Sequence, residues 1–156
     1  MGYYIDLLEP NPDLAKAIDD LGNGIAALYQ ECWNKEQRKY YSDKPFDLAI
    51  NTFASMWFHG DMKVFMVYSD DGKPIGFLTG VKFRPMSYDA QVFQIHEWYT
   101  RGDTEIEQAL FDHVMSAIRI LGCQEVWCAV HPDGPTPKMK GWKKERDFIT
   151  QRYVKE

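Results

Sequence analysis

The chain has 156 residues, a formal net charge of −5 at pH 7 and 45% hydrophobic residues, which is typical of one globular domain with a sizeable core. The negative net charge argues against general nucleic-acid binding, because phosphate contacts need clustered Lys and Arg. No apolar run approaches the roughly 20 residues that span a bilayer, and the first residues lack a secretory signal. We therefore expect one cytoplasmic domain, residues 1–156, that contacts neither nucleic acid nor membrane.

The N-terminal part is predicted to form a strand and then helices. Residues 3–8 are rich in β-forming side chains, and Asp13 follows a turn at the start of a helix. Gly22-Asn23-Gly24 interrupts the helical period, so two short helices and one kinked helix fit the sequence equally well. A further helix is predicted from Lys44-Pro45, with Ser42 or Asp43 as its cap, to a stop at Gly60.

The middle of the chain is predicted to form an antiparallel hairpin. Two runs of β-forming residues, 64–68 and 74–83, flank the turn sequence Asp70-Asp71-Gly72-Lys73. Asp-Gly tolerates the positive φ that such turns need. The two runs should therefore pair with each other in the sheet.

Residues 92–130 predict a strand, an amphipathic helix and a second strand. Apolar side chains recur at helical spacing along one helix face, namely Ile106, Leu110, Val114 (with His113 beside it), Ala117 and Leu121. Gly122 is placed to end the helix. Thr104 and Glu107 have the spacing of a capping box, so Thr104 is the expected N-cap. A strand–helix–strand unit of this length predicts a right-handed crossover between parallel strands.

The C-terminal part predicts a short helix from Pro137 to about Arg146 and a last strand over residues 148–154. The full order is then β, α, α, a β–β hairpin, β, α, β, α, β. It defines an α/β (α+β) fold in which helices flank a mixed, mostly antiparallel central sheet.

His96 and Glu97 are the candidates for acid–base chemistry on the predicted strand. The ordinary alternative is that one side chain faces solvent and the other makes a structural hydrogen bond. The four histidines and three cysteines show no metal-ligand spacing, so no metal site is expected.

The order of elements resembles the GNAT family of N-acetyltransferases, most clearly over residues 64–156. The D-D-G-K-P-I-G-F hairpin is similar to that family's second and third strands, and the strand and helix of residues 92–121 are similar to its fourth strand and coenzyme helix. The resemblance implies the acyl-CoA N-acyltransferase fold, acetyl-CoA as the coenzyme, and a small-molecule or protein amine as the acceptor.

The same resemblance implies roles for individual residues. His96 or Glu97 would remove the amine proton, directly or through water. Backbone groups around Trp98 and Tyr99 would contact the coenzyme and the reacting carbonyl. The following turn, with Arg101, Gly102 and Thr104, would hold the pyrophosphate.

The turn departs from the family's pattern. Residues 102–107 align with the family's R-G-x-G-I-G motif, yet carboxylates of Asp103, Glu105 and Glu107 replace the glycines. Carboxylates in a first helical turn stabilise the helix by roughly 0.3–1 kcal/mol each, and they repel phosphate. The predicted last helix also lacks the Tyr with which the family protonates the departing thiolate.

Two hypotheses follow. The chain is an acetyltransferase that transfers an acetyl group from acetyl-CoA to an amine, or it is a pseudoenzyme, a catalytically silent binding or structural protein on the same scaffold. The second hypothesis implies a protein partner or a homo-oligomer. The compact, aromatic-rich chain is similar to small acetyltransferase-like proteins of bacteriophages, some of which are virion components, so the virion is the alternative location if the chain is encoded by a bacteriophage.

Overall fold

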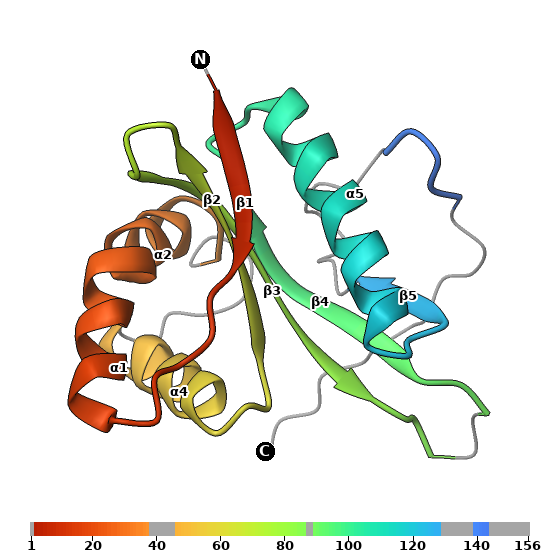
Figure 1. Ribbon diagram of the computed structural model, residues 1–156, viewed down its shortest axis with the longest axis horizontal. Helices are drawn as coiled ribbons and strands as arrows, with labels where there is room; N and C mark the ends of the chain where they lie inside the picture. The colour runs from red at the N-terminus through yellow and green to blue at the C-terminus, as the bar shows by residue number, and fades with distance from the viewer. Residues whose placement is uncertain (1, 38–45, 87–88, 129–138, 144–156) are drawn as a thin grey trace, which may run out of the picture.

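A five-stranded mixed sheet forms the centre of the computed structural model, which describes residues 2–37, 46–86, 89–128 and 139–143 (Figure 1). The strands lie in the order β1-β2-β3-β4-β5. Their bounds are β1 Tyr3–Leu7, β2 Lys63–Ser69, β3 Pro74–Phe83, β4 Val92–Tyr99 and β5 Glu125–Cys128. The first three pairs are antiparallel and β4–β5 is parallel. The predicted mixed, mostly antiparallel sheet, its hairpin and its parallel crossover are therefore confirmed.

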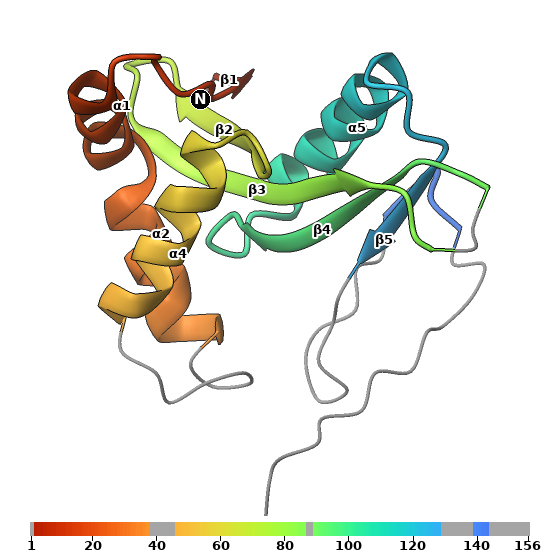
Figure 2. The same cartoon turned by 90° about the horizontal axis from the view of Figure 1, so that it is seen from below.

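Helices cover both faces of the sheet (Figure 2). On one face lie α1 (Leu14–Leu21), α2 (Ala27–Cys32) and α4 (Phe46–Phe58), and on the other lies α5 (Thr104–Ile120). Each face has its own apolar core. Buried side chains on the α2 side include Ile25, Leu28, Phe53, Trp57 and Phe77, and those on the α5 side include Phe65, Leu78, Phe93, Leu110 and Phe111.

The first helical segment runs without a break from α1 to α2. Asp13 caps it by accepting from the amides of Ala15 and Lys16, as predicted for a helix start at this residue. The Gly-Asn-Gly sequence forms a π-helical turn, η1 (Gly22–Ala26), and a second π turn, η2 (Trp33–Gln37), follows α2. Of the two predicted alternatives, the single helix is correct. A π turn accommodates an extra residue inside a helix, so the glycines do not end it.

The predicted stop of α4 is confirmed, because the helix ends at Phe58 and Gly60, two residues later, takes a positive φ of 82°. Ser42 and Asp43, the two predicted caps at the start of this helix, lie outside the described residues.

The N-cap of helix α5 is Asp103, one residue before the predicted N-cap, Thr104. The Asp103 carboxylate accepts from the amides of Glu105 and Ile106, each at 3.1 Å, and Thr104 is already helical. The predicted capping box of Thr104 and Glu107 is therefore wrong. A carboxylate one residue ahead of Thr104 reaches the orphan amides of Glu105 and Ile106 and also interacts favourably with the positive end of the helix. Gly122 takes the predicted positive φ, at 83°.

The described part of the C-terminal segment is a turn, so the helix predicted over residues 137–146 is wrong there. Gly141 has a φ of 82°, a conformation that favours glycine. The Lys140 amide donates to Gln108 Oε1 at 2.9 Å, and Gln108 Nε2 donates to the Lys140 carbonyl at 3.1 Å. The Gln108 side chain of α5 therefore pairs with the amide and the carbonyl of Lys140, two groups that a helix would have paired with other backbone groups. The predicted strand over residues 148–154 lies outside the described residues.

A β-bulge interrupts β4 at His96. Thr79 of β3 lies opposite Glu97, while the next residue of β3, Gly80, lies opposite Ile95. His96 is the extra residue. Bulges bend a strand and redirect side chains, often beside active sites. Because of the bulge at His96, Ile95 packs in the core under α5, while Glu97 points to α2.

Gly80 is required by close packing at the bulge. A Cβ at this position would lie 2.5 Å from ring atoms of Phe93 and 2.6 Å from the Gln94 carbonyl oxygen. We expect Gly80→Ala to lower the free energy of unfolding by about 1–3 kcal/mol in urea denaturation. The control is Gly22→Ala, where nothing lies within 4 Å of the new Cβ and the helical backbone favours Ala. Equal stability of the two variants would contradict the packing argument.

Candidate functional site

The candidate site lies at the end of β4 and in the turn that follows it. Within the described residues, the last parallel pair joins Ile95 to Cys128, and β4 extends to Tyr99. The strand then enters a tight turn, in which Arg101 and Gly102 take positive φ of 54° and 78°. This turn leads to the N-terminus of α5. The end of β4, this turn and the first residue of α5 hold the residues that the sequence assigned to catalysis or coenzyme binding.

Glu97 has the environment of a general base. Its partly buried carboxylate accepts a hydrogen bond from the Tyr29 hydroxyl of α2, with 3.1 Å between that hydroxyl oxygen and Oε1. Burial raises the pKa of Glu97 to about 7, and the hydrogen bond from Tyr29 opposes part of that rise. The second oxygen, Oε2, is buried and has no hydrogen-bond partner among the described residues. A carboxylate with a pKa close to neutrality is well matched to take a proton.

His96 occupies a different environment from its neighbour. Its side chain is exposed at the bulge, and partial burial lowers its pKa. The predicted pair is therefore split, with the imidazole on the surface and the carboxylate under α2. The alternative stated for this pair, in which one side chain faces solvent and the other makes a hydrogen bond, is the arrangement that the structure has. Glu97 is the better candidate base, because burial raises its pKa to about 7, whereas burial lowers the pKa of His96.

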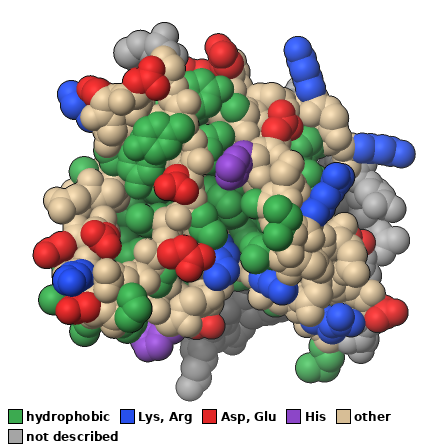
Figure 3. Space-filling model, in the orientation of Figure 1, with side chains coloured by type: hydrophobic (Ala, Val, Ile, Leu, Met, Phe, Trp, Pro, Cys, Tyr) green, Lys and Arg blue, Asp and Glu red, His purple; other side chains and the backbone are tan. Residues whose placement is uncertain are grey.

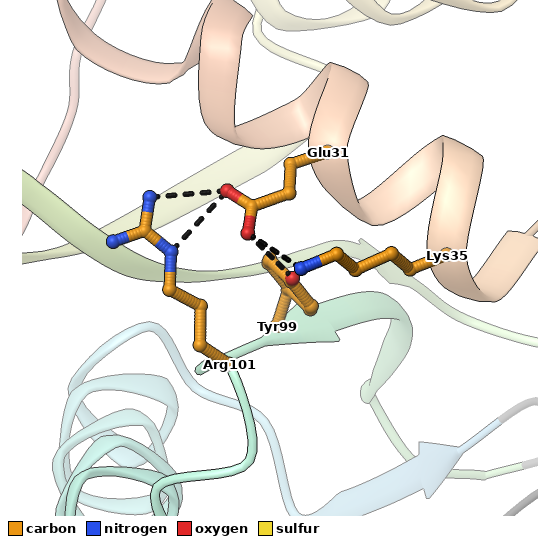
Figure 4. Close-up of polar contacts among 4 residues, drawn as sticks. All are labelled: Glu31, Lys35, Tyr99 and Arg101. Atoms are coloured by element: carbon orange, nitrogen blue, oxygen red, sulfur yellow. Dashed lines mark hydrogen bonds and ion pairs between the residues drawn. The ribbon is translucent and has the colours of Figure 1, made fainter.

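A second Tyr–Glu contact mirrors the first. The Tyr99 hydroxyl of β4 donates to Glu31 Oε1 of α2 at 2.9 Å, two residues beyond the Tyr29–Glu97 contact on both elements. Lys35 and Arg101 also bind Glu31, with Nζ–Oε1 and Nη2–Oε2 distances of 3.0 Å (Figure 4). The Arg101 guanidinium is the main reason that the pKa of Glu31 falls to about 2. The two contacts fix α2 across the end of β4.

Trp98 faces the opposite side of the sheet. Its indole packs edge-on against Phe111 at 5.7 Å between ring centroids, and its Nε1 donates to Glu107 Oε1 at 3.0 Å. The side chains of Trp98 and Tyr99 are thus engaged inside the protein. The contacts that the family resemblance implies would therefore fall to backbone groups of these residues that do not pair with β3.

The turn before α5 allows a test of whether a pyrophosphate fits. In the family's pattern a phosphate binds the free amides of the helix N-terminus. Here the Asp103 carboxylate already accepts from two of these amides. Arg101, the nearest cation, is bound to Glu31. Gly102 is exposed and open, and Thr104 contributes no cap. The described residues of the turn therefore do not fit the pyrophosphate of acetyl-CoA.

Three residues of the site were not foreseen from the sequence: Tyr29, Glu31 and Thr79. Tyr29 and Glu31 are separated from their β4 partners by 68 residues, and Thr79 lies opposite Glu97 on the neighbouring strand. The helical period places Tyr29 on a buried face, which is the signal of an ordinary core residue. Their roles depend on tertiary contacts for which the chain carries no local signal.

Among the described residues, no group of three or more His, Cys, Asp or Glu side chains could hold a metal ion. No helix in those ranges is long and apolar enough to cross a membrane.

Comparisons with known proteins give fold relatives only. No family model matches the sequence, and no curated protein matches it. Among solved structures, an aminoglycoside 6′-N-acetyltransferase from Acinetobacter baumannii is 12% identical, with a TM-score of 0.63 over 98% of this chain and 99% of that one. A ribosomal-protein-alanine N-acetyltransferase from Brucella melitensis is 12% identical, with a TM-score of 0.59 over 96% and 100%. A GNAT family acetyltransferase from Staphylococcus aureus is 17% identical, with a TM-score of 0.54 over 93% and 99%.

These structures define the class of fold. The chain has the mixed sheet and flanking helices of the GNAT acetyltransferases over nearly its whole length, and the fold implied by the family resemblance is confirmed. Identities of 12–17% carry no information on substrate or coenzyme, because one fold hosts many functions.

Proposed function

We propose that the chain is an N-acyltransferase that receives a primary amine at Glu97. The observation that supports the proposal is the Glu97 carboxylate, which has a pKa of about 7 and keeps one buried oxygen without a partner among the described residues. The net charge of −5 favours a cationic acceptor. Acidic side chains are more frequent over the half of the molecule formed by α1, α2 and α4, on the face drawn in Figure 3.

Tyr29 prepares Glu97 for this role. Burial, together with the nearby Glu97 charge, raises the pKa of Tyr29, so its hydroxyl keeps its proton and donates to Oε1 at every physiological pH. Oε2 is then the oxygen that takes a proton from the amine. The amine binds in its neutral form and attacks the carbonyl of an acyl thioester. As the new C–N bond forms, the nitrogen loses one proton to Oε2, the C–S bond breaks, and the thiolate leaves. His96 is an exposed second candidate for the proton transfer.

Acetyl-CoA is the acyl donor that the fold implies, and the backbone of Trp98 and Tyr99 would lie beside its thioester. The Asp103 cap opposes its pyrophosphate. We therefore test the proposal with a donor that has no phosphate, the acetyl thioester of N-acetylcysteamine, and with primary amines as acceptors. Formation of the amide, detected by mass spectrometry, is the expected result.

The pH dependence of this reaction is set by Glu97. A base works only when it is deprotonated, so kcat should rise about tenfold per pH unit below pH 7 and reach a plateau above it. The kcat profile should therefore bend at about pH 7, because the pKa of Glu97 is about 7. A profile that is flat between pH 5 and 8 would exclude Glu97 as the base.

A second candidate function is a catalytically silent protein on the same scaffold. The specific observation that favours it is the Asp103 carboxylate on the amides at the start of α5. In this case we expect no transfer from any thioester, and a homo-oligomer or a complex with another protein that forms without coenzyme. In both cases we propose a cytoplasmic location, or the virion if the chain is encoded by a bacteriophage.

A further inference from the structure

Strand β1 forms an open edge of the sheet. It pairs with β2 on one side, and among the described residues no strand lies on its other side (Figure 2). Bulges, Pro and Lys are common devices that protect a free edge from pairing with another chain. The pairing of β1 with β2 keeps one register from Tyr3 to Leu7 without a bulge, and the strand contains neither Pro nor Lys. This edge of the sheet therefore lacks the usual protection.

The backbone of β1 shows which groups point to the open edge. The Asp70 amide donates to the Gly2 carbonyl at 3.2 Å, and the Leu8 amide donates to the Val64 carbonyl at 2.8 Å. In an antiparallel ladder, residue pairs that share hydrogen bonds alternate with pairs that do not, so the even-numbered residues of β1 bond to β2. The amides and carbonyls of the odd-numbered residues point away from β2, namely those of Tyr3, Ile5 and Leu7.

An exposed side chain covers part of this edge. The Asp6 carboxylate accepts from the Leu7 amide at 3.0 Å, which agrees with an amide that points away from β2. The bond is exposed and joins two neighbouring residues. It can be exchanged for a bond to another strand at little net cost, because both bonds are made in contact with water.

The side chains of β1 are self-complementary in one antiparallel register. Tyr3, Ile5 and Leu7 pack on the α5 side of the sheet, and alternation places Tyr4 and Asp6 on the other side, where both are exposed. If two copies pair with Ile5 at a two-fold axis, Ile5 lies opposite Ile5 and Tyr3 opposite Leu7. Apolar side chains then meet on one face, while Tyr4 lies opposite Asp6 on the other.

The neighbouring registers that keep the same edge bonds are less favourable. A shift by two residues in one direction places Asp6 opposite Asp6 of the second copy, and like charges directly opposite each other are destabilising. The same shift in the other direction places Tyr4 opposite Tyr4 and pairs Leu7 with a residue outside the strand. One register therefore uses the whole strand and avoids the repulsion.

We infer that β1 is the interface of a two-fold dimer, in which β1 of one copy pairs antiparallel with β1 of a second copy and the two sheets become one. A second copy supplies the apolar side chains and the Tyr at the required positions through the symmetry itself. Strands β2 and β3 separate β1 from β4, so this pairing uses no residue of the candidate site. The inference is therefore independent of whether the chain is an active enzyme or a silent protein.

The mass in solution, measured by light scattering after size-exclusion chromatography, tests the dimer. We expect about twice the 18.2 kDa of one chain. Ile5→Pro removes an amide that points away from β2, so the bonds to β2 remain and the mass should fall to that of one chain. Ile5→Ala is the matched control, because it also loses side-chain volume but keeps the amide, and it should remain a dimer. An original chain that stays monomeric at about 1 mM would overturn the inference.

Two substitutions at Tyr4 test the register and do not depend on the folding of Ile5→Pro. Tyr4 is 48% exposed, so both variants should fold, and both lose the stacking on Tyr68. Tyr4→Asp places a carboxylate opposite Asp6 of the second copy, whereas Tyr4→Lys places an ammonium there. We expect the dimer dissociation constant of Tyr4→Asp to exceed that of Tyr4→Lys by about tenfold or more. Equal constants would refute the pairing of β1 with itself in this register.

Hydrogen exchange measured by NMR distinguishes β1 from any other dimer surface. The Ile5 amide should exchange at least about tenfold more slowly in the dimer than in the dissociated Tyr4→Asp chain. The Asp6 amide, on an even-numbered residue that bonds to β2, is the control and should be protected in both. A dimer of the expected mass in which the Ile5 amide exchanges as fast as in the single chain would refute the inference.

Discussion

Glu97→Gln is expected to slow acyl transfer from the short thioester by roughly 10²- to 10⁴-fold, the range for loss of a general base. Gln keeps the shape of the side chain and can still accept from the Tyr29 hydroxyl, but it cannot take the proton of the amine. The fall should be in kcat, because the amine still binds. His96→Gln is the matched control, since His96 is the neighbouring candidate on the surface. A full loss of activity in His96→Gln, with Glu97→Gln unaffected, would exchange the two roles.

The same substitution is expected to stabilise the protein at high pH. Burial raises the pKa of Glu97 from 4.5 to about 7, so the folded chain holds this proton more tightly than the unfolded chain. The contribution to stability is full below about pH 4.5 and is lost as the pH rises through 7. The gap between the two values corresponds to about 3 kcal/mol. Glu97→Gln does not ionise and should therefore gain roughly 2–3 kcal/mol over the original chain at pH 8, but not at pH 4.

Urea denaturation at several pH values checks this result, and Glu31→Gln is the control with the opposite sign. The pKa of Glu31 is lowered to about 2, mainly by Arg101, so its contribution is present above about pH 4.5 and lost as the pH falls through 2. The pair is partly exposed, with 27% of the Glu31 side chain accessible, and is worth about 0–1 kcal/mol. A stability difference between Glu97→Gln and the original chain that does not change with pH would contradict the burial of the charge.

Asp103→Gly is expected to raise the affinity for acetyl-CoA by about 10- to 100-fold in calorimetric titration, which corresponds to roughly 1.4–2.8 kcal/mol. The original chain should bind more weakly than about 1 mM. The substitution frees the amides of Glu105 and Ile106, to which the carboxylate is bound, and removes a charge that repels pyrophosphate. Glycine is tolerated at an N-cap, so the helix should remain.

Asp103→Asn separates the two effects, because Asn keeps the cap bonds and loses only the charge. It should gain a few-fold, equivalent to about 0.3–1 kcal/mol. Asp112→Asn removes a charge from the exposed middle of α5 and should change nothing. Glu105→Gly and Glu107→Gly added to Asp103→Gly should raise the affinity further. Micromolar binding of acetyl-CoA by the original chain would show that the Asp103 carboxylate moves aside.

Local signals in the sequence predicted most of the fold. The hairpin from β2 to β3, the end of α5 at Gly122 and the stop at Gly60 each depend on a glycine with positive φ next to a periodic apolar run. The start of α5 was not predicted correctly. Asp103 and Thr104 are both good N-caps, and the choice between adjacent caps depends on the turn that precedes them. The backbone around Gly141 follows its contact with Gln108 of α5, which no local pattern contains.

The site was predictable only in part, for a related reason. Adjacency on a strand identified His96 and Glu97 as candidates. The bulge that separates their environments depends on the register between β3 and β4, and side-chain alternation alone cannot locate it. Arg101 was foreseen beside the coenzyme turn. That it binds Glu31 instead depends on how α2 lies across the sheet, far from it in the sequence.

The π turns on either side of α2 have a consequence for how this site tolerates changes in chain length. A π turn holds one residue more than a regular turn, and each residue of an α-helix advances the chain by about 100° around the axis. Without the extra residue in Gly22–Ala26, the face of α2 would rotate relative to α1 by that angle, and Tyr29 would no longer point at Glu97. The alignment of the candidate base therefore depends on the phase between two helix segments. A one-residue deletion well away from the site would disturb it more than many substitutions close by.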